Sequence, residues 1–305
     1  MIKRLFGFTL LLVTIGCANV EDQTAIETEE KIQVVCTTSM LTDWMQELAT
    51  EEIEVIPLLK KGMDPHVYKP SKKDLDVLRS ADVIIYHGLH LEGKIIEVLE
   101  HMDDALVIDA SSDFPDSLII RDPNFPASTD PHYWFDLDLV NRSLQTMVEG
   151  IGSAYPQLQE ALNSQRASYS ASLAEVGDSV QKIIETIPAE LRIVITTHDA
   201  LSYFARDFGL EVNTLQGAST VSEFGLKEIT ELVDFICENK IPAIFLENIV
   251  SPQAMESVQR GCQAKGFEVE LGPELLSDSL GAEEDQDTYA EMLLFNARTL
   301  AAYLN

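Results

Sequence analysis

Short β-branched runs alternate with amphipathic segments twice along this chain, first between residues 32 and 108 and again after residue 190. In the first stretch the expected strands are residues 32–37, 53–58, 83–86 and 106–108, with helical patterns at 42–49, 72–80 and 94–101. In the second, the expected strands are 191–196, 211–214, 243–246 and 268–271, with helices at 200–207, 226–239, 252–265 and 288–303. Strands that alternate with helices indicate βαβ units and a mainly parallel sheet, so the chain is expected to be α/β.

The region between the two stretches, residues 137–187, has no strand signal. Its Ala, Leu, Gln and Glu content favours helix, and residues 156–184 follow one helical pattern, which would be roughly 40 Å long. We therefore predict an N-terminal α/β lobe (32–140), a helical region (141–187) and a C-terminal α/β lobe (188–305). One long helix would join the lobes, and a continuous helix would restrict hinge motion.

The N-terminus begins with Met1-Ile2-Lys3-Arg4 and continues with an apolar stretch that ends at Gly16-Cys17. A basic start before a short apolar run is typical of a secretory signal peptide, here residues 1–16. The small residue before Cys17 resembles a lipobox, although Thr14 stands where Leu is usual. We expect Cys17 to be lipidated and residues 17–31 to form a flexible tether outside the cytoplasmic membrane, at the cell surface or in the periplasm. Simple cleavage and release is the alternative.

The chain is strongly acidic, with a formal net charge of −30 at pH 7. Loss of the signal peptide would leave 19 basic and 51 acidic residues, a net charge of −32. Such a surface argues against nucleic acid as a partner and against attraction to anionic lipid headgroups.

Apart from Cys17, the chain has three cysteines: Cys36, Cys237 and Cys262. In an oxidising compartment at most one pair can close within a monomer. Cys237 and Cys262 lie on consecutive predicted helices and could pair. Three buried, apolar thiols are the alternative.

Three of the six histidines lie at expected strand-to-helix junctions, where α/β proteins bind their ligands. The tripeptide Asp-Pro-His occurs twice and ends at His66 and His132, and His198 follows the strand at 191–196. Imidazole is the commonest protein ligand for transition metals, so metal binding is the first hypothesis. Ordinary loop or capping histidines are the alternative.

A fourth ligand is expected from another strand end of the second lobe, and Asp278 is the candidate there. Three imidazoles and one carboxylate would form a closed set around a borderline divalent cation. A helix N-cap is the alternative for this aspartate. For Asp64, Asp130 and Asp199 we expect capping or turn roles, with orientation of the imidazoles as the second interpretation.

Several ordered segments resemble the zinc/manganese ABC-transporter solute-binding proteins, the TroA-like receptors. They are residues 57–71 (PLLKKGMDPHVYKPS), 81–94 (ADVIIYHGLHLEGK), 130–136 (DPHYWFD), 197–204 (THDALSYF), 216–220 (QGAST) and 242–247 (PAIFLE). The resemblance implies two α/β lobes bridged by a rigid helix, with a metal at their interface. Carried over position by position, it implies His66, His132, His198 and Asp278 as the ligands.

Some residues depart from the pattern of that family. His87 stands where Asn is usual, and neither His87 nor His90 is an expected ligand. Residues 111–129 contain no histidine, unlike the His-rich loop of many zinc-specific members, which favours manganese or a mixed-metal receptor. His198 points the other way, because many manganese-type members have Glu there and nitrogen ligands favour zinc. Manganese and zinc both stay open, with iron as a further alternative.

The resemblance implies a monomeric receptor, not an enzyme, that delivers the metal to an ABC permease and its ATPase. Binding needs neutral imidazoles, so affinity is expected to fall as the pH drops through about 6. A surface adhesin that uses the metal structurally is one alternative. A metallohydrolase is the other, with Asp199 or Glu247 as a weak candidate for its general base.

Overall fold

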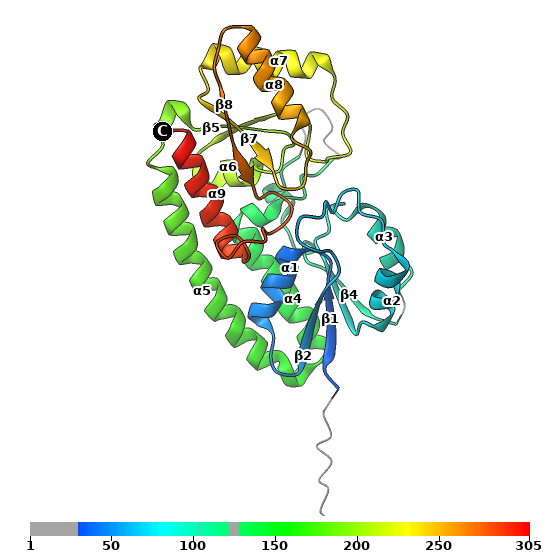
Figure 1. Ribbon diagram of the computed structural model, residues 1–305. Helices are drawn as coiled ribbons and strands as arrows, with labels where there is room; N and C mark the ends of the chain where they lie inside the picture. Colours follow the sequence, from blue (N-terminus) through cyan, green and yellow to red (C-terminus); the bar gives the residue numbers. More distant parts are fainter. Residues whose placement is uncertain (1–29, 103, 122–127) are drawn as a thin grey trace, which may run out of the picture. The chain divides into compact units, whose positions relative to one another are not determined.

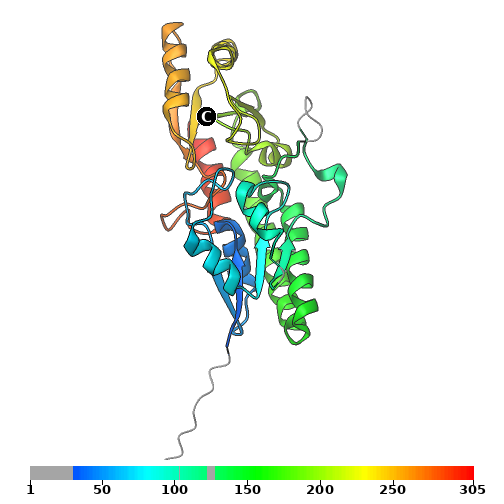
Figure 2. The same ribbon diagram turned by 90° about the vertical axis from the view of Figure 1, so that its right-hand side faces the viewer.

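All eight predicted strands are present, and each pairing between them is parallel. The computed structural model describes residues 30–102, 104–121 and 128–305. The predicted signal peptide, Cys17 and nearly all of the predicted tether lie outside these residues. Residues from Lys31 to Asn305 form one unit, and its elements are followed in Figures 1 and 2.

The first sheet has four strands in the order β2-β1-β3-β4. They are β1 (Ile32–Cys36), β2 (Ile53–Pro57), β3 (Val83–Tyr86) and β4 (Leu106–Asp109). Side chains alternate between the faces of a strand, and β1 shows it clearly: Val34 and Cys36 pack in one apolar cluster and Val35 in another. Because β1 has apolar residues on both of its faces, its sequence is hydrophobic without a polar alternation.

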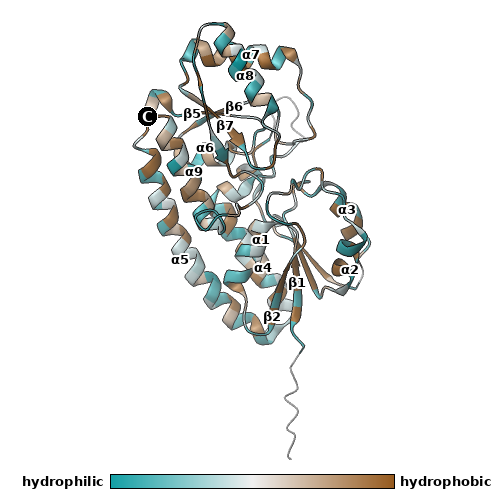
Figure 3. Cartoon of the chain, viewed as in Figure 1, coloured by the Kyte–Doolittle hydropathy of each residue, from teal (hydrophilic) through white to brown (hydrophobic). Residues whose placement is uncertain are grey.

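Helices cover both faces of this sheet. They are α1 (Ser39–Leu48), α2 (Lys72–Ser80), α3 (Gly93–Leu99) and α4 (Leu137–Ala154). Trp44 of α1 and Leu144 of α4 share a cluster with Val34, whereas Leu78 of α2 and Ile95 of α3 share one with Val35. The hydropathy colours of Figure 3 show the sheet as predominantly apolar and the helices as mixed.

The predicted long helix is present and begins with a single 3₁₀ turn. That turn, Pro156–Leu158, leads into α5 (Gln159–Ile184), a helix of 26 residues and about 39 Å. Proline at the start suits a first turn, where no amide donor is needed. Helix α5 packs along α1, α4 and α9, so it is braced along its length by elements from both ends of the chain.

The second set of strands forms two parallel pairs, β5–β6 and β7–β8, with β5 lying beside β7. The strands are β5 (Ile193–Thr196), β6 (Glu211–Thr214), β7 (Ala243–Glu247) and β8 (Glu270–Leu275). The helices are α6 (Ser202–Phe208), α7 (Leu226–Asn239), α8 (Gln253–Ala264) and α9 (Tyr289–Tyr303). Among the helices of the described residues, none is long and apolar enough to cross a membrane.

The last strand lies further along the chain than its hydrophobic pattern predicts. Residues 268–271 were the expected strand, but β8 runs from Glu270 to Leu275 and includes Gly272 and Pro273. Gly and Pro weaken a strand signal, and here they coincide with a register shift opposite Phe245 and Leu246. Because β8 ends at Leu275, its carboxyl end lies three residues before Asp278.

The buried apolar residues form three clusters, and the largest includes residues of both strand sets. It joins Trp44 of α1, Leu173 of α5, Phe204 of α6 and Leu293 of α9. One smaller cluster lies under α2 and α3, and the other lies under α7 and α8. The two strand sets are thus joined by a shared apolar core.

Candidate metal centre

The four predicted ligands lie at the carboxyl ends of strands from both sets. His66 follows β2, and His132 lies in the segment between β4 and the 3₁₀ turn Tyr133–Phe135. His198 follows β5 directly, and Asp278 follows β8. Because parallel strands end at one edge of a sheet, their following loops converge there.

The structure brings the ligand atoms of these four residues within 4.8 Å of one another. The Oδ2 atom of Asp278 lies 3.2 Å from Nε2 of His66 and 3.4 Å from Nε2 of His198. The Oδ1 atom of Asp278 lies 3.4 Å from Nε2 of His132, and the Nε2 atoms of His66 and His132 are 3.3 Å apart. Tetrahedral ligands at bond lengths of about 2.1 Å would be about 3.4 Å apart, so these spacings fit a bound cation.

The polar atoms at the centre of this cluster are buried without hydrogen bonds among the described residues. Both carboxylate oxygens of Asp278 and Nε2 of His198 are in this state. A buried ionised group without a partner is costly, whereas a divalent cation would satisfy all of these atoms together. The residues present therefore fit a metal ion.

Two of the imidazoles are held by buried carboxylates through the ring nitrogen that faces away from Asp278. Nδ1 of His132 donates to Oδ1 of Asp130 at 2.6 Å, and Nδ1 of His198 donates to Oε2 of Glu247 at 2.6 Å. A carboxylate accepts only, so each bond leaves the Nε2 lone pair free for a metal. Asp130 and Glu247 thus select the tautomer that a ligand needs.

The pKa values of the metal-free site reflect the same contacts. Burial disfavours a charge on His132, but the carboxylates of Asp278 and Asp130 outweigh it and raise the pKa to about 9. For His198, burial is outweighed by Glu247 and Asp278, which raise its pKa well above the usual value. Burial would raise the pKa of Asp278, yet His198 and His132 hold it well below its usual value. Protons therefore compete with a metal at a higher pH than they would at unperturbed histidines, for which competition is expected near pH 6.

The loop that carries Asp278 is fixed by its neighbours on both sides. The indole of Trp134 donates to the carbonyl of Ser277 at 2.9 Å, and Asn248 donates to the carbonyl of Ser279 at 2.9 Å. The amide of Leu280 donates to Oγ of Ser39, in α1, at 2.9 Å. These bonds tie a loop of the second strand set to the first set, so the carboxylate is held in place before a metal arrives.

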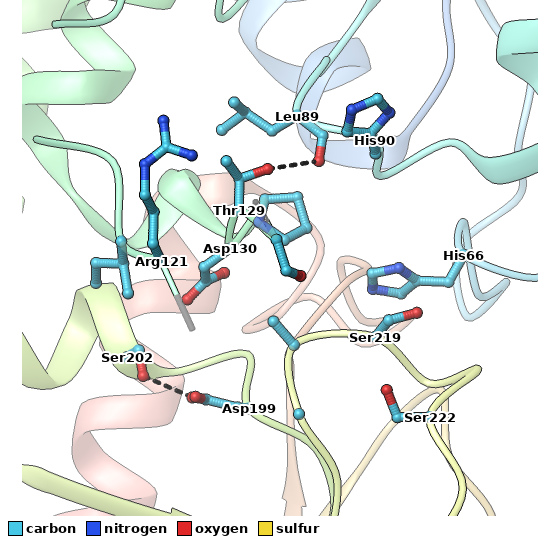
Figure 4. A pocket seen from close by; sticks show the side chains of 15 residues that line it. His66, Leu89, His90, Arg121, Thr129, Asp130, Asp199, Ser202, Ser219 and Ser222 are labelled. Atoms are coloured by element: carbon cyan, nitrogen blue, oxygen red, sulfur yellow. Dashed lines mark hydrogen bonds between the residues drawn. The ribbon is translucent and has the colours of Figure 1, made fainter. Parts of the chain in front are cut away.

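A cavity of about 750 Å³ lies beside the metal cluster and is lined by loops of both strand sets. His66 lines this cavity together with His90, Asp130 and Asp199, and Figure 4 shows these residues around it. His66 is 8% exposed, while the other three ligands are at most 1% exposed. Solvent therefore reaches the cluster from the side of His66.

Of the three acids proposed to orient imidazoles, Asp130 contacts a ligand ring. Asp64 instead accepts the backbone amide of His66 at 2.8 Å and the hydroxyl of Thr220 at 2.7 Å. Asp199 accepts the hydroxyl of Ser202, the first residue of α6, at 2.6 Å. Asp64 thus makes a turn contact with the His66 backbone, whereas Asp199 contacts a side chain of α6 and does not cap a backbone amide of that helix.

The two histidines that were not expected to be ligands lie outside the cluster. His87 is fully buried, with Nε2 2.8 Å from the hydroxyl of Thr38 and Nδ1 2.8 Å from the hydroxyl of Tyr133. Its ring packs 4.9 Å from that of Trp134. His90 is exposed and lines the cavity, where its backbone has a φ of 66°.

Sequence reasoning missed the contacts made by Glu247, Trp134 and Asn248. Glu247 was considered only as a weak candidate base, yet its carboxylate is bonded to His198. Its position at the end of the strand beside β5 was the available signal, since neighbouring parallel strands end side by side. The bonds from Trp134 and Asn248 depend on loop conformations that no sequence pattern specified.

Comparison with known proteins identifies similar chains over nearly the whole described region. A family model described as ZnuA, zinc-uptake complex component A periplasmic, matches residues 34–303. The manganese-binding lipoprotein MntA of Bacillus subtilis is 35% identical over 295 residues, which cover 95% of this chain and 94% of MntA. The zinc-binding protein TroA of Treponema pallidum is 35% identical over 275 residues, which cover 89% of this chain and 88% of TroA. The solved structure of the periplasmic zinc-binding protein TroA superposes with a TM-score of 0.86 at 34% identity, covering 90% of this chain and 99% of that one.

Proposed function

The chain belongs to the ZnuA family of periplasmic zinc-uptake components, and we propose that it captures a divalent transition metal for an ABC importer. The observation that carries this proposal is the cluster of three imidazoles and one carboxylate, buried and converging on one point. The metal is cargo in this role, so the site must bind it tightly and also be able to open.

We assign His66, His132, His198 and Asp278 as the ligands, two from residues 32–140 and two from residues 188–305. A bound ion would then link the two predicted lobes directly. The shared core beneath the site opposes wide separation of these lobes. Release is therefore expected to start with movement of a loop that carries a ligand. The loop after β2 is the best candidate, because its ligand His66 is the most exposed of the four and lines the cavity.

The cargo that we propose is manganese or zinc. Two relatives of equal identity are named for different metals, MntA for manganese and TroA for zinc. Three nitrogen ligands favour zinc by intrinsic affinity, while the two oxygens of Asp278 that face the imidazoles would allow the larger coordination number that manganese accepts. Iron also accepts imidazole and carboxylate ligands, so it is a third candidate for the same site.

The partners that we propose are a membrane permease and its ATPase, with the chain held outside the cytoplasmic membrane by a lipid on Cys17. Its relatives include chains named as lipoproteins. We propose a monomer, because all four ligands come from one chain.

Neither alternative function gains support from the geometry of the site. A hydrolytic metal site needs a free general base as well as a position for water. The two candidate bases are engaged, Glu247 with His198 and Asp199 with Ser202. The relatives reported above are named for metal binding, not for adhesion.

Elemental analysis tests the central claim. The unit from Lys31 to Asn305 would be stripped of metal, equilibrated with equal and limiting manganese and zinc, and freed of unbound ions. We expect about one equivalent of metal in the wild-type unit, its loss in His66→Ala, and a manganese-to-zinc ratio that identifies the preferred cargo.

The matched control is His101→Ala, which removes an exposed histidine at the end of α3 and should keep the metal. Circular dichroism would verify that both variants are folded. A wild-type unit that holds no stoichiometric metal, or a His66→Ala variant that holds as much, would contradict the proposal.

A further inference from the structure

The thiols of Cys237 and Cys262 meet between two neighbouring helices of the C-terminal half. Cys237 is in the last turn of α7 and half-buried, whereas Cys262 is in α8 and fully buried. Both belong to the apolar cluster beneath these helices, and Cys237 lies close enough to Cys262 to raise the pKa of its thiol. All three cysteines of the described residues are free thiols in the structure.

Close approach of the two helices explains why these thiols meet. Gly261, next to Cys262, faces Val233, which is one turn before Cys237 on α7. A Cβ atom added to Gly261 would lie 2.6 Å from a methyl group of Val233. A disulfide needs Cα atoms about 4.4–6.8 Å apart, and a glycine at the contact between two helices allows their backbones to approach closely.

A second contact joins the same two helices. Lys265, the C-cap of α8, pairs with Asp234 of α7, so the ion pair, the two thiols and the Val233–Gly261 contact all lie between these two helices. The cysteines are thus held opposite each other by neighbours on both sides.

We propose that Cys237 and Cys262 form a disulfide that links α7 to α8 once the chain is exposed to a thiol oxidant. The location of the chain outside the cytoplasm, which belongs to the proposed function, is where such oxidants operate. Cys36 takes no part, because it lies in β1 and is packed in a different cluster.

The reaction is an exchange with a disulfide-containing oxidant. The thiolate of Cys237, the more exposed of the two, attacks one sulfur of the oxidant and releases the other as a thiolate. The thiolate of Cys262 then attacks the Cys237 sulfur and releases the second thiolate. Two protein thiols lose two protons and two electrons, and the oxidant is reduced to two thiols. Burial and the neighbouring Cys237 raise the pKa of Cys262 to about 12, so the second step should accelerate as the pH rises.

Oxidised glutathione acting on the folded unit from Lys31 to Asn305 tests this proposal. After alkylation and digestion, mass spectrometry should find the Cys237 and Cys262 peptides joined, with the loss of two hydrogen masses. Linkage closes a loop of intermediate length, so Tm should rise by roughly 5 °C. Cys237→Ser should show neither change, whereas Cys36→Ala should keep the link.

The result that would overturn the proposal is a wild-type protein in which oxidation leaves both thiols free, or leaves glutathione on Cys237 without closure. The disulfide-linked peptide is detected by mass spectrometry in the wild-type protein, so the conclusion does not depend on how well a variant folds. Metal content measured on the same samples separates this proposal from the receptor function. The thiol pair can close in a protein that holds no metal, and the site can bind metal in a protein whose thiols stay reduced.

Discussion

At the level of single residues, two imidazoles of the proposed metal centre are hydrogen-bonded to buried acids. Asp130 accepts from Nδ1 of His132, and Glu247 accepts from Nδ1 of His198. In the proposed site these acids would have two effects: they would fix which ring nitrogen faces the metal, and they would add negative charge near the cation. The affinity of the site should therefore depend on residues that do not contact the ion.

Glu247→Gln tests that dependence. The amide keeps the size of the side chain but removes its charge and one acceptor oxygen, so His198 is less firmly oriented. We expect metal affinity to fall roughly 10- to 100-fold, the usual effect of losing such a partner. Competition with a fluorescent chelator would measure the dissociation constant.

The comparison variant is Glu238→Gln, the same change at an exposed position of α7. Its affinity should match that of the wild type. If Glu247→Gln bound metal as tightly as Glu238→Gln, Glu247 would have no part in orienting His198.

At the level of elements, one buried carboxylate lies where three helices meet. Asp43 of α1 accepts the backbone amide of Tyr289, the first residue of α9, at 3.0 Å, and the hydroxyl of Tyr169 of α5 at 3.5 Å. Burial raises the pKa of Asp43 to about 6. The folded protein thus holds a proton on this group at a pH where the unfolded chain has released it.

This shift predicts a pH-dependent stability. An unfolded aspartate titrates near pH 4, so the contribution of Asp43 to stability is fully present below about pH 4 and is lost as the pH rises through about 6. Asp43→Asn should gain about 3 kcal/mol in unfolding free energy relative to the wild type between pH 4 and pH 7. Urea unfolding of the metal-free protein across this range would measure the difference.

Asp178→Asn, at an exposed position of α5, provides the reference for the same chemical change. The pH dependence of Asp43→Asn would be compared with that of this variant. A difference between Asp43→Asn and the wild type that stays constant with pH would mean that Asp43 titrates alike in the folded and unfolded states.

The elements also show where sequence patterns were sufficient. Helices α2 and α7 have the predicted bounds, and α2 begins with a capping box between Ser71 and Asp74 that the local sequence encodes. Strand β8 was displaced because Gly272 and Pro273 interrupt its apolar pattern. Its true position is set by pairing with β7, a long-range contact that no local window contains.

At the level of the whole molecule, the metal cluster and the largest apolar cluster both join segments far apart in the chain. His66 and Asp278 are separated by more than 200 positions, and Trp44 shares its core with Leu293. A bound metal adds a further link on top of a core that is already shared. Binding should stabilise the folded unit as a whole.

Thermal unfolding with and without metal tests this expectation. At metal concentrations of about 100 times the dissociation constant, the folded state gains about 2.7 kcal/mol, which corresponds to a Tm increase of roughly 5–10 °C for a domain of this size. Addition of a chelator should reverse the shift in the wild type. An equal shift in His66→Ala would show that the stabilising metal binds elsewhere.

The sequence by itself determined the order and type of the elements and the residue types of the metal centre. Local periodicity, proline and capping signals act over a few residues, so the strand and helix sets and the Asp-Pro-His motifs could be recognised without a structure. The tertiary structure alone decided which acid holds each imidazole, how the Asp278 loop is fixed by Ser39 and Trp134, and that the two strand sets share one core. These features depend on contacts between segments that are distant in the chain, and such contacts exist only once the chain has packed.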